Sequence, residues 1–367
     1  MRLLAVDIGT GTQDILLLDT TQTVENALQL IMPSPTQIAA GRIRAATAAA
    51  RPLVLTGVIA GGGPCAWALE DHLRAALPAY ATPEAAATFD DDLDAVRGMG
   101  VTISAEDELR KIDAARIRLM DLDLPTIRNA LAEFGVSGDF DGIAVGCLDH
   151  GASPPGYSDR LFRFDHLRRV VGQRNDLRAF AMLPGELPDY LTRARAVVRC
   201  AEGPAPVVFV DTGPAAALGA LQDPAAGEPE EQVVMNLGNM HALCFHLRGT
   251  QIISLYEHHT GEVTPEQIVD FTERLVGGSL RHEDIFDSNG HGTFYARDTS
   301  VRAASRPITA VTGPQRGKVR GSRLEPYFAV PHGDMMVSGC FGLLWGFAEK
   351  VPEHADEVLG ALGVPVN

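Results

Sequence analysis

The stretch LLAVDIGTGTQDILLLD, residues 3–19, decides the fold class of this chain. It is apolar up to Val6, polar and glycine-containing in the middle, and apolar again over residues 15–18. Two apolar runs around a Gly/Thr break are typical of two strands joined by a turn. The plan of apolar strand, polar residue, glycine turn and return strand recurs at 233–247, VVMNLGNMHALCFHL. This predicts a weak internal duplication, with chance similarity of two hairpins as the alternative.

The rest of the chain alternates short apolar runs with helical periodicity. The runs predict strands at 53–59, 142–148, 206–210, 250–257 and 308–312, and the periodicity predicts helices at 66–77, 84–97, 105–134, 166–180, 187–199, 214–221, 265–276 and 333–350. Such alternation indicates an α/β protein with mixed sheets. At 367 residues, the length favours two domains.

Composition excludes several classes of function. The chain has 31 Lys and Arg against 47 Asp and Glu, a net charge of −16, so it repels phosphate backbones and we expect no nucleic-acid partner. No run approaches the roughly 18 apolar residues of a membrane span, and no signal peptide is recognisable, so we expect a cytoplasmic protein with no membrane partner. The five cysteines are widely spaced without a CxxC pair, which disfavours a cysteine zinc site or a local iron–sulfur motif.

The motifs together resemble those of the superfamily of actin, sugar and acetate kinases and heat-shock chaperone ATPases. Residues 6–12, VDIGTGT, resemble its first phosphate loop, and 236–241, NLGNMH, fall where its second would lie. Residues 211–217 resemble its connecting helix, 308–316 its adenosine loop and 329–335 its closing helix. The resemblance implies duplicated ribonuclease-H-like domains, with mixed sheets flanking a central cleft. We divide them at 1–204 and 205–367, with the final helix packing back toward the first domain.

Within that superfamily the chain is most similar to a bacterial and archaeal family labelled "pyruvate formate-lyase-activating-enzyme-like". The shared features are DIGTGTQDILL at 7–17, DHG at 149–151, EHHT at 257–260, GHG at 290–292 and HGDMM at 332–336. A radical S-adenosylmethionine activase needs three closely spaced cysteines for its four-iron cluster. This sequence has no such triplet, so we do not expect that chemistry.

The resemblance implies a phosphate-binding role for the first loop. Its glycines, Gly9 and Gly11, let the backbone approach phosphate oxygens, and the hydroxyls of Thr10 and Thr12 add donors. Asp7 would hold Mg²⁺ through water, because Mg²⁺ keeps much of its hydration shell. The alternative is an ordinary hairpin turn with a half-buried Asp.

The second loop departs from the superfamily pattern. Asn236 stands where an Asp is expected, and an uncharged amide is a weaker partner for Mg²⁺. This weakens the case for fast ATP hydrolysis. Predicted cofactor-binding residues here and in the adenosine loop, where Arg316 would stack on a ring, are Asn236, Gly238, Asn239, His241, Gly313 and Arg316.

Candidate catalytic residues follow the apolar run 142–148. In related kinases and ATPases the base lies at such a strand end, so Asp149 or His150 would accept the proton of an acceptor hydroxyl or water. Otherwise Asp149 caps a turn and His150 is structural. A transition-metal site of Asp149, His150, His259 and His291 is a further alternative, against loop histidines that bond only to the backbone.

Three functions remain open from the sequence. The first is an ATP- and Mg²⁺-dependent phosphotransferase or ATPase acting on an unidentified small-molecule or protein acceptor. The second is a nucleotide-binding switch or activator with little turnover, which Asn236 favours. The third is an inactive cleft that binds another small molecule.

Overall fold

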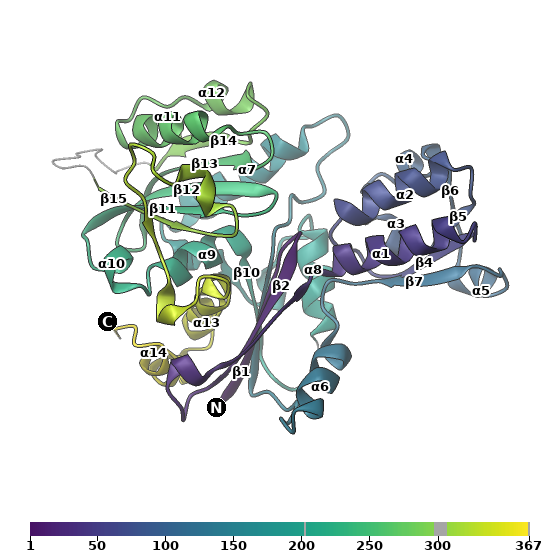
Figure 1. The fold of residues 1–367 in the computed structure, drawn as a ribbon, viewed down its shortest axis with the longest axis horizontal. Coiled ribbons are helices and arrows are strands. Elements are labelled where there is room, and N and C mark those ends of the chain that lie inside the picture. The colour runs from purple at the N-terminus through teal and green to yellow at the C-terminus, as the bar shows by residue number, and fades with distance from the viewer. Residues whose placement is uncertain (202, 297–306, 366–367) are drawn as a thin grey trace.

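The computed structural model describes residues 1–201, 203–296 and 307–365, and within them it has three sheets (Figure 1). The first sheet has the order β3-β2-β1-β8-β10-β9. Its strands are β1 (Arg2–Ile8), β2 (Thr12–Asp19), β3 (Leu28–Pro33), β8 (Gly142–Cys147), β9 (Ala181–Met182) and β10 (Val207–Asp211). The first three pair antiparallel, whereas β8 and β10 run parallel to β1. This is the strand order of a ribonuclease-H-like domain.

The second sheet has the order β14-β13-β12-β11-β15-β16, in which β13-β12-β11-β15-β16 corresponds to β3-β2-β1-β8-β10 of the first sheet. Its strands are β11 (Glu231–Leu237), β12 (His241–Arg248), β13 (Gln251–His259), β14 (Gly292–Tyr295), β15 (Ile308–Thr312) and β16 (Tyr327–Phe328). Four strands, β11 to β14, form an antiparallel meander, and β15 and β16 continue the sheet in parallel from β11. The predicted duplicated α/β fold is therefore confirmed by topology.

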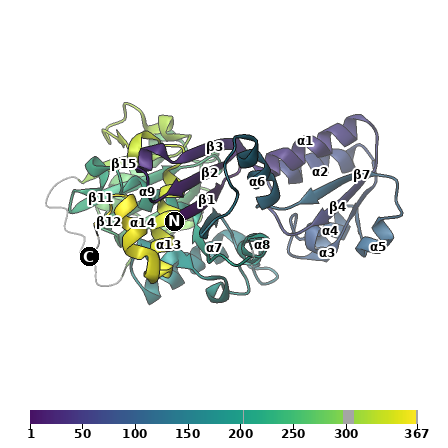
Figure 2. The same cartoon turned by 90° about the horizontal axis from the view of Figure 1, so that it is seen from below.

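A third, all-parallel sheet forms a lobe inserted between β3 and β8, at the right of Figure 1 and again at one end of Figure 2. Its elements are α1 (Pro35–Ala48), β4 (Leu53–Gly57), α2 (Pro64–Arg74), β5 (Ala79–Ala81), α3 (Pro83–Ala86), α4 (Leu93–Gly98), β6 (Val101–Ile103), α5 (Glu106–Leu109) and β7 (Ala115–Leu119). The lobe has a core of its own, built around Ile43, Leu55 and Leu69.

The predicted helix over 105–134 is wrong in its middle. That stretch contains α5, strand β7 and then α6 (Leu124–Glu133). In ARIRL, residues 115–119, side chains at 117 and 119 are buried while those at 116 and 118 are exposed, which is the two-residue period of a strand. Parallel pairing with β4 inside the lobe therefore holds this segment as a strand and not as a helix.

Two glycine-containing helices pack together beside the sheets. They are α9 (Thr212–Ala220) and α13 (Ser338–Lys350), which also contacts β1, β8 and β10. A Cβ on Gly219 would overlap the carbonyl of Ser338, and one on Gly342 would overlap that of Ala215. The glycines of α13 therefore allow close helix packing, which outweighs their low helix propensity.

The remaining helices complete the two halves. They are α7 (Asp159–Gln173), α8 (Thr192–Cys200), α10 (Pro224–Gly227), α11 (Pro265–Val276), α12 (His282–Phe286) and α14 (Ala355–Ala361). The domain division at 204/205 stays a prediction, although β10, beyond that point, pairs with β8 in the first sheet.

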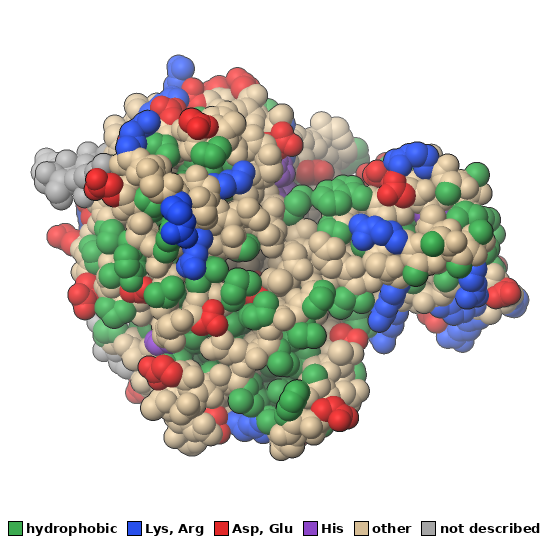
Figure 3. All heavy atoms as spheres, in the orientation of Figure 1, with side chains coloured by type: hydrophobic (Ala, Val, Ile, Leu, Met, Phe, Trp, Pro, Cys, Tyr) green, Lys and Arg blue, Asp and Glu red, His purple; other side chains and the backbone are tan. Residues whose placement is uncertain are grey.

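Acidic and basic side chains are interspersed on the face shown in Figure 3. Among the described residues, every helix is too short or too polar to cross a bilayer.

Candidate functional site

The two predicted phosphate loops have the same internal geometry. In the first, Gly9 N donates to Thr12 O over 2.9 Å, and in the second Gly238 N donates to His241 O over 3.0 Å. Each turn thus begins two residues after its polar strand residue, which is Asp7 in β1 and Asn236 in β11. Residues 10–11 and 239–240 form the two tips.

The tips face each other across one crevice. A Cβ on Gly11 would overlap the side-chain amide of Asn239, so the loops are in close contact there. The crevice has a volume of 90 Å³, room for a few water molecules. It is lined by Asp7, Gly9, Thr10, Thr12, Asp14, Thr212, Ala216, Asn236, Gly238, Asn239, Thr312, Gly313, Pro314, Met335, Met336, Ser338 and Gly339.

Two carboxylates lie at the base of the crevice. Asp7 and Asp14 are directly opposite in the β1–β2 ladder. Asp7 accepts a 2.5 Å hydrogen bond from Thr212 Oγ1, whereas Asp14 Oδ1 is buried with no hydrogen-bond partner among the described residues. Burial raises the pKa of Asp7 to about 6, and burial together with the charge of Asp7 raises the pKa of Asp14 to about 7.

This pair fits a hard divalent cation. Mg²⁺ takes oxygen ligands and is commonly held by one or two carboxylates with water. An unpartnered buried carboxylate oxygen beside a second carboxylate is the arrangement that such a cation would neutralise. Asp14, which sequence reasoning left out of the site, is signalled only by its register opposite Asp7.

Glycines keep the crevice open beside these polar groups. A Cβ on Gly339, at the start of α13, would overlap the carboxylate of Asp7. Gly313 has φ +92°, and a Cβ there would lie 2.6 Å from Asn236 Oδ1. Glycines from two segments therefore bring the backbone close to Asp7 and Asn236.

The predicted adenine-stacking residue already has an aromatic partner. The guanidinium of Arg316 lies 5.4 Å from the centroid of the Phe328 ring, and Nη1 donates to Ala329 O over 3.4 Å. A role for Arg316 in binding adenosine stays a prediction.

The two predicted catalytic residues point to different surroundings. The carboxylate of Asp149 accepts hydrogen bonds from Gly151 N at 2.8 Å and Ala194 N at 2.9 Å, so both oxygens are engaged by the backbone. The side chain of His150 instead meets other histidines.

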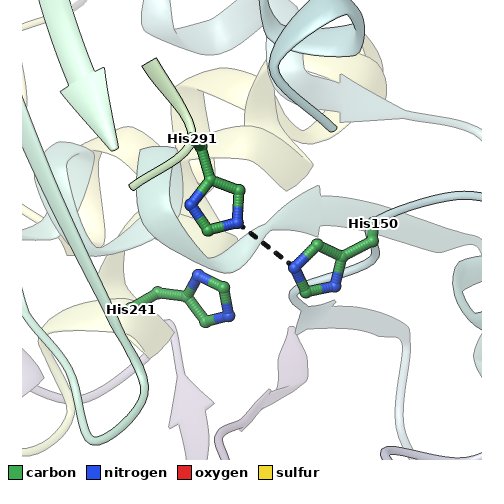
Figure 4. Close-up of side chains that lie close together, drawn as sticks. All are labelled: His150, His241 and His291. Carbon is green, nitrogen blue, oxygen red and sulfur yellow. Dashed lines mark hydrogen bonds between the residues drawn. The ribbon is translucent and has the colours of Figure 1, made fainter. Parts of the chain in front are cut away.

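Four imidazoles gather where the two halves meet. His150 follows β8, His241 begins β12, His259 ends β13 and His291 precedes β14. The rings of His259 and His291 have centroids 4.5 Å apart, and the ring of His241 lies 5.1 Å from those of His150, His259 and His291. Figure 4 shows the rings of His150, His241 and His291 converging.

Burial keeps most of these rings neutral. It lowers the pKa of His291 to about 2 and that of His259 to about 4, and it holds the pKa of His150 well below its usual value. Neutral imidazoles have a free lone pair, which a metal ion or a proton donor requires.

A buried ion network lies next to the histidines. Arg163, from α7, forms a bidentate pair with Asp211, the Nη2–Oδ1 contact being 3.1 Å, and its Nε donates to Glu257 Oε2 over 3.2 Å. All three side chains are at most 5% exposed. Sequence reasoning gave no role to Arg163 or Glu257. The available signal was a glutamate that directly follows the largely apolar run IISLY, 252–256.

The predicted metal set of Asp149, His150, His259 and His291 differs from the group whose ligand atoms the structure brings together. Ligand atoms of His150, His241 and His291 lie within 4.8 Å of one another. Asp149 is held by the backbone, as described above, and His241 was predicted only as a cofactor-binding residue.

Comparison with known proteins identifies the family. The model of the family described as "Putative pyruvate format-lyase activating enzyme (DUF1786)" matches residues 60–318. The chain therefore belongs to this family, and its two halves have the duplicated ribonuclease-H-like strand order described above. No curated protein sequence matches the chain.

Several solved structures are distantly similar. A ROK hexokinase from Thermus thermophilus has 11% identity and a TM-score of 0.34, covering 96% of this chain and 100% of its own. The activator of the 2-hydroxyisocaproyl-CoA dehydratase from Clostridium difficile, with bound ADPNP, has 9% identity and a TM-score of 0.33, covering 96% and 97%. A Ppx/GppA family member from Aquifex aeolicus has 9% identity and a TM-score of 0.28, covering 99% and 88%. Because these TM-scores are low, the ribonuclease-H-like fold is assigned from the strand order of the two sheets and not from these structures.

Proposed function

We propose that this protein binds ATP and Mg²⁺ between its two halves and acts as a phosphotransferase or ATPase. The observation that supports this is the pair of equivalent glycine loops meeting over the carboxylates of Asp7 and Asp14. Backbone N–H groups at the loop tips would bind phosphate oxygens. Asp7 and Asp14 would hold Mg²⁺, which neutralises phosphate charge when bound.

Nucleotide binding requires the crevice to widen. Its 90 Å³ holds only a few waters, and Met335 and Met336 contribute to its wall. Gly11 and Asn239 belong to different halves, so a relative movement of the halves separates the tips. Such domain closure around a ligand is a common way to exclude water from phosphoryl transfer.

The acceptor would approach from the histidine side of the crevice. The oxygens of Asp149 are engaged by backbone donors, so we assign the acceptor-side base to the neutral ring of His150. The proton of the attacking hydroxyl or water would move to a ring nitrogen of His150.

Thermal unfolding with and without ATP–Mg²⁺ tests the binding proposal. A ligand at 100 times its dissociation constant should stabilise the chain by about 2.7 kcal/mol. Asp7→Asn should lose most of this increment, measured against its own unliganded melting temperature. Asp19→Asn, at the far end of the same hairpin, is the matched control and should keep it. No stabilisation of the wild type by ATP or ADP would refute the proposal.

One feature favours the second candidate, a nucleotide-dependent switch with little turnover. Asn236 occupies the position equivalent to Asp7 and carries no charge. If the missing carboxylate limits turnover, Asn236→Asp should increase phosphate release at unchanged ATP binding. Phosphate release that is already fast in the wild type would contradict the switch.

A further inference from the structure

We propose that His150, His241 and His291 form a binding site for one divalent transition-metal ion of the kind that prefers imidazole, such as Zn²⁺. The site is distinct from the Mg²⁺ position proposed at Asp7, because its donors are nitrogens rather than carboxylates. Imidazole suits zinc, iron, copper and nickel, whereas Mg²⁺ prefers oxygen. The proposal does not depend on nucleotide binding.

The spacing of the ligand atoms suits a metal. Those of the three residues lie within 4.8 Å of one another, and Nε2 of His150 lies 3.4 Å from Nε2 of His291. Two nitrogens bound to one zinc at 2.0–2.1 Å, at a tetrahedral angle, are about 3.3 Å apart. The His150–His291 pair therefore already has the separation of two ligands, and His241 needs only a small adjustment to join them.

The polar groups of the cluster are only partly satisfied. Nδ1 of His291 is buried without a hydrogen bond among the described residues, and Nδ1 of His241 has a single contact, with Oε1 of Glu257 at 3.3 Å. A hydrogen bond between the two Nε2 atoms uses one nitrogen of each ring and still leaves Nδ1 of His291 without a partner among the described residues. A single cation would engage a lone pair from every ring, which is why we prefer it to a hydrogen-bonded histidine cluster.

Charge next to the cluster also favours a cation. The buried network contains one positive group, Arg163, and two carboxylates, Asp211 and Glu257, so its formal sum is −1. Glu257 Oε1 lies 3.3 Å from Nδ1 of His241. Carboxylates beside metal-bound histidines orient the rings and increase their basicity, and Glu257 is placed for that role.

The site would be open on one side. His291 is fully buried, but His150 and His241 are partly exposed. Three histidines with an open fourth position are characteristic of catalytic rather than structural zinc, where water or substrate completes the coordination. The metal would then replace the free His150 ring as the acceptor-side group, because a coordinated nitrogen no longer accepts a proton.

Metal binding by the full-length chain, without nucleotide, tests the proposal. After treatment with a chelator, the protein is titrated with Zn²⁺ by equilibrium dialysis and with Co²⁺ by visible absorption. We expect one ion per chain and Co²⁺ bands of a nitrogen-rich site. His291→Ala and His241→Gln should weaken Zn²⁺ binding by more than about 100-fold, and Glu257→Gln by about 10–100-fold, the range for outer-shell partners.

The same metal-binding assay provides the control and the outcomes that would overturn the proposal. His332→Ala is the matched control, because its ring bonds to Gln222 and packs on Phe341, away from the cluster, and it should bind Zn²⁺ like the wild type. The partly exposed His241 gives a second variant should His291→Ala fail to fold. Absence of stoichiometric Zn²⁺ or Co²⁺ in the wild type would overturn the proposal, as would wild-type affinity in folded His241→Gln.

Discussion

Replacing Asp14 by Asn should stabilise the protein at neutral and alkaline pH. Asp14 carries a carboxylate whose Oδ1 is buried without a partner in the described part of the chain, opposite Asp7. Its pKa is about 7 in the folded chain, against an ordinary value of 3.8. Between these values the folded chain binds more protons than the unfolded chain, so the free energy of unfolding falls as pH rises. The isosteric amide cannot ionise and should abolish this loss.

The pKa shift sets the size of the effect. A difference of about 3 pKa units corresponds to about 4 kcal/mol at 1.36 kcal/mol per unit, reached above about pH 7. The Asp14 side chain is partly exposed, and part of the shift comes from Asp7, so we expect about 2 kcal/mol after allowing for solvent screening. Near pH 4 Asp14 is protonated in the folded chain but only partly in the unfolded chain, so the difference should shrink to about 0.5 kcal/mol.

Urea unfolding of both proteins over about pH 4–8 measures this difference. Asp19→Asn is the control, because hydrogen bonds from Thr21 lower the pKa of Asp19, so its replacement should be destabilising rather than stabilising at neutral pH. Adding Mg²⁺ at about pH 8 should stabilise the wild type and leave Asp14→Asn nearly unchanged. A pH dependence that is the same in wild type and Asp14→Asn would refute the reasoning.

Two further predictions concern packing and buried charge. Arg163→Met leaves two buried carboxylates without their cation and should cost about 3–5 kcal/mol of stability in urea unfolding; a loss below 1 kcal/mol would contradict the network. Gly342→Ala places a methyl group against the carbonyl of Ala215 and should cost about 1–3 kcal/mol, whereas Gly360→Ala, with open space around its Cβ position, should be neutral or stabilising in the same thermal scan.

The fold could be predicted largely because its strands are marked locally. The two hairpins carry an apolar–glycine–apolar pattern, and their order in the chain indicated the duplication. The inserted lobe was harder to anticipate, because its strands are short and one of them, β7, carries alternating arginines that imitate a polar helix. Strand pairing inside the lobe, not local periodicity, determines that segment.

The candidate site likewise has one part that the local sequence indicates and another part that it does not. Asp7 lies near the end of β1, and Gly9 and Gly238 begin glycine-containing turns, so these residues could be proposed directly from the sequence. The convergence of His150, His241 and His291 depends on three separate strand ends, and no spacing in the sequence encodes it. Arg163 was missed because its helix has no motif and its partners lie 48 and 94 residues away.

The two equivalent hairpins have diverged toward different ligands, and this couples the two proposed sites. Thr12 of the first turn corresponds to His241 of the second, which belongs to the histidine cluster. That cluster joins His150 of the first half to two residues of the second, so a bound metal would hold the halves together. ATP, by contrast, requires the crevice to widen. We therefore expect a stoichiometrically bound Zn²⁺ ion to weaken the binding of ATP–Mg²⁺. ATP should in turn weaken the binding of Zn²⁺ by the same factor, because coupling between two binding sites is reciprocal. Calorimetric titration of ATP–Mg²⁺ into the metal-free and the Zn²⁺-loaded protein measures this factor, and equal dissociation constants would show that the two sites do not share a movement of the halves.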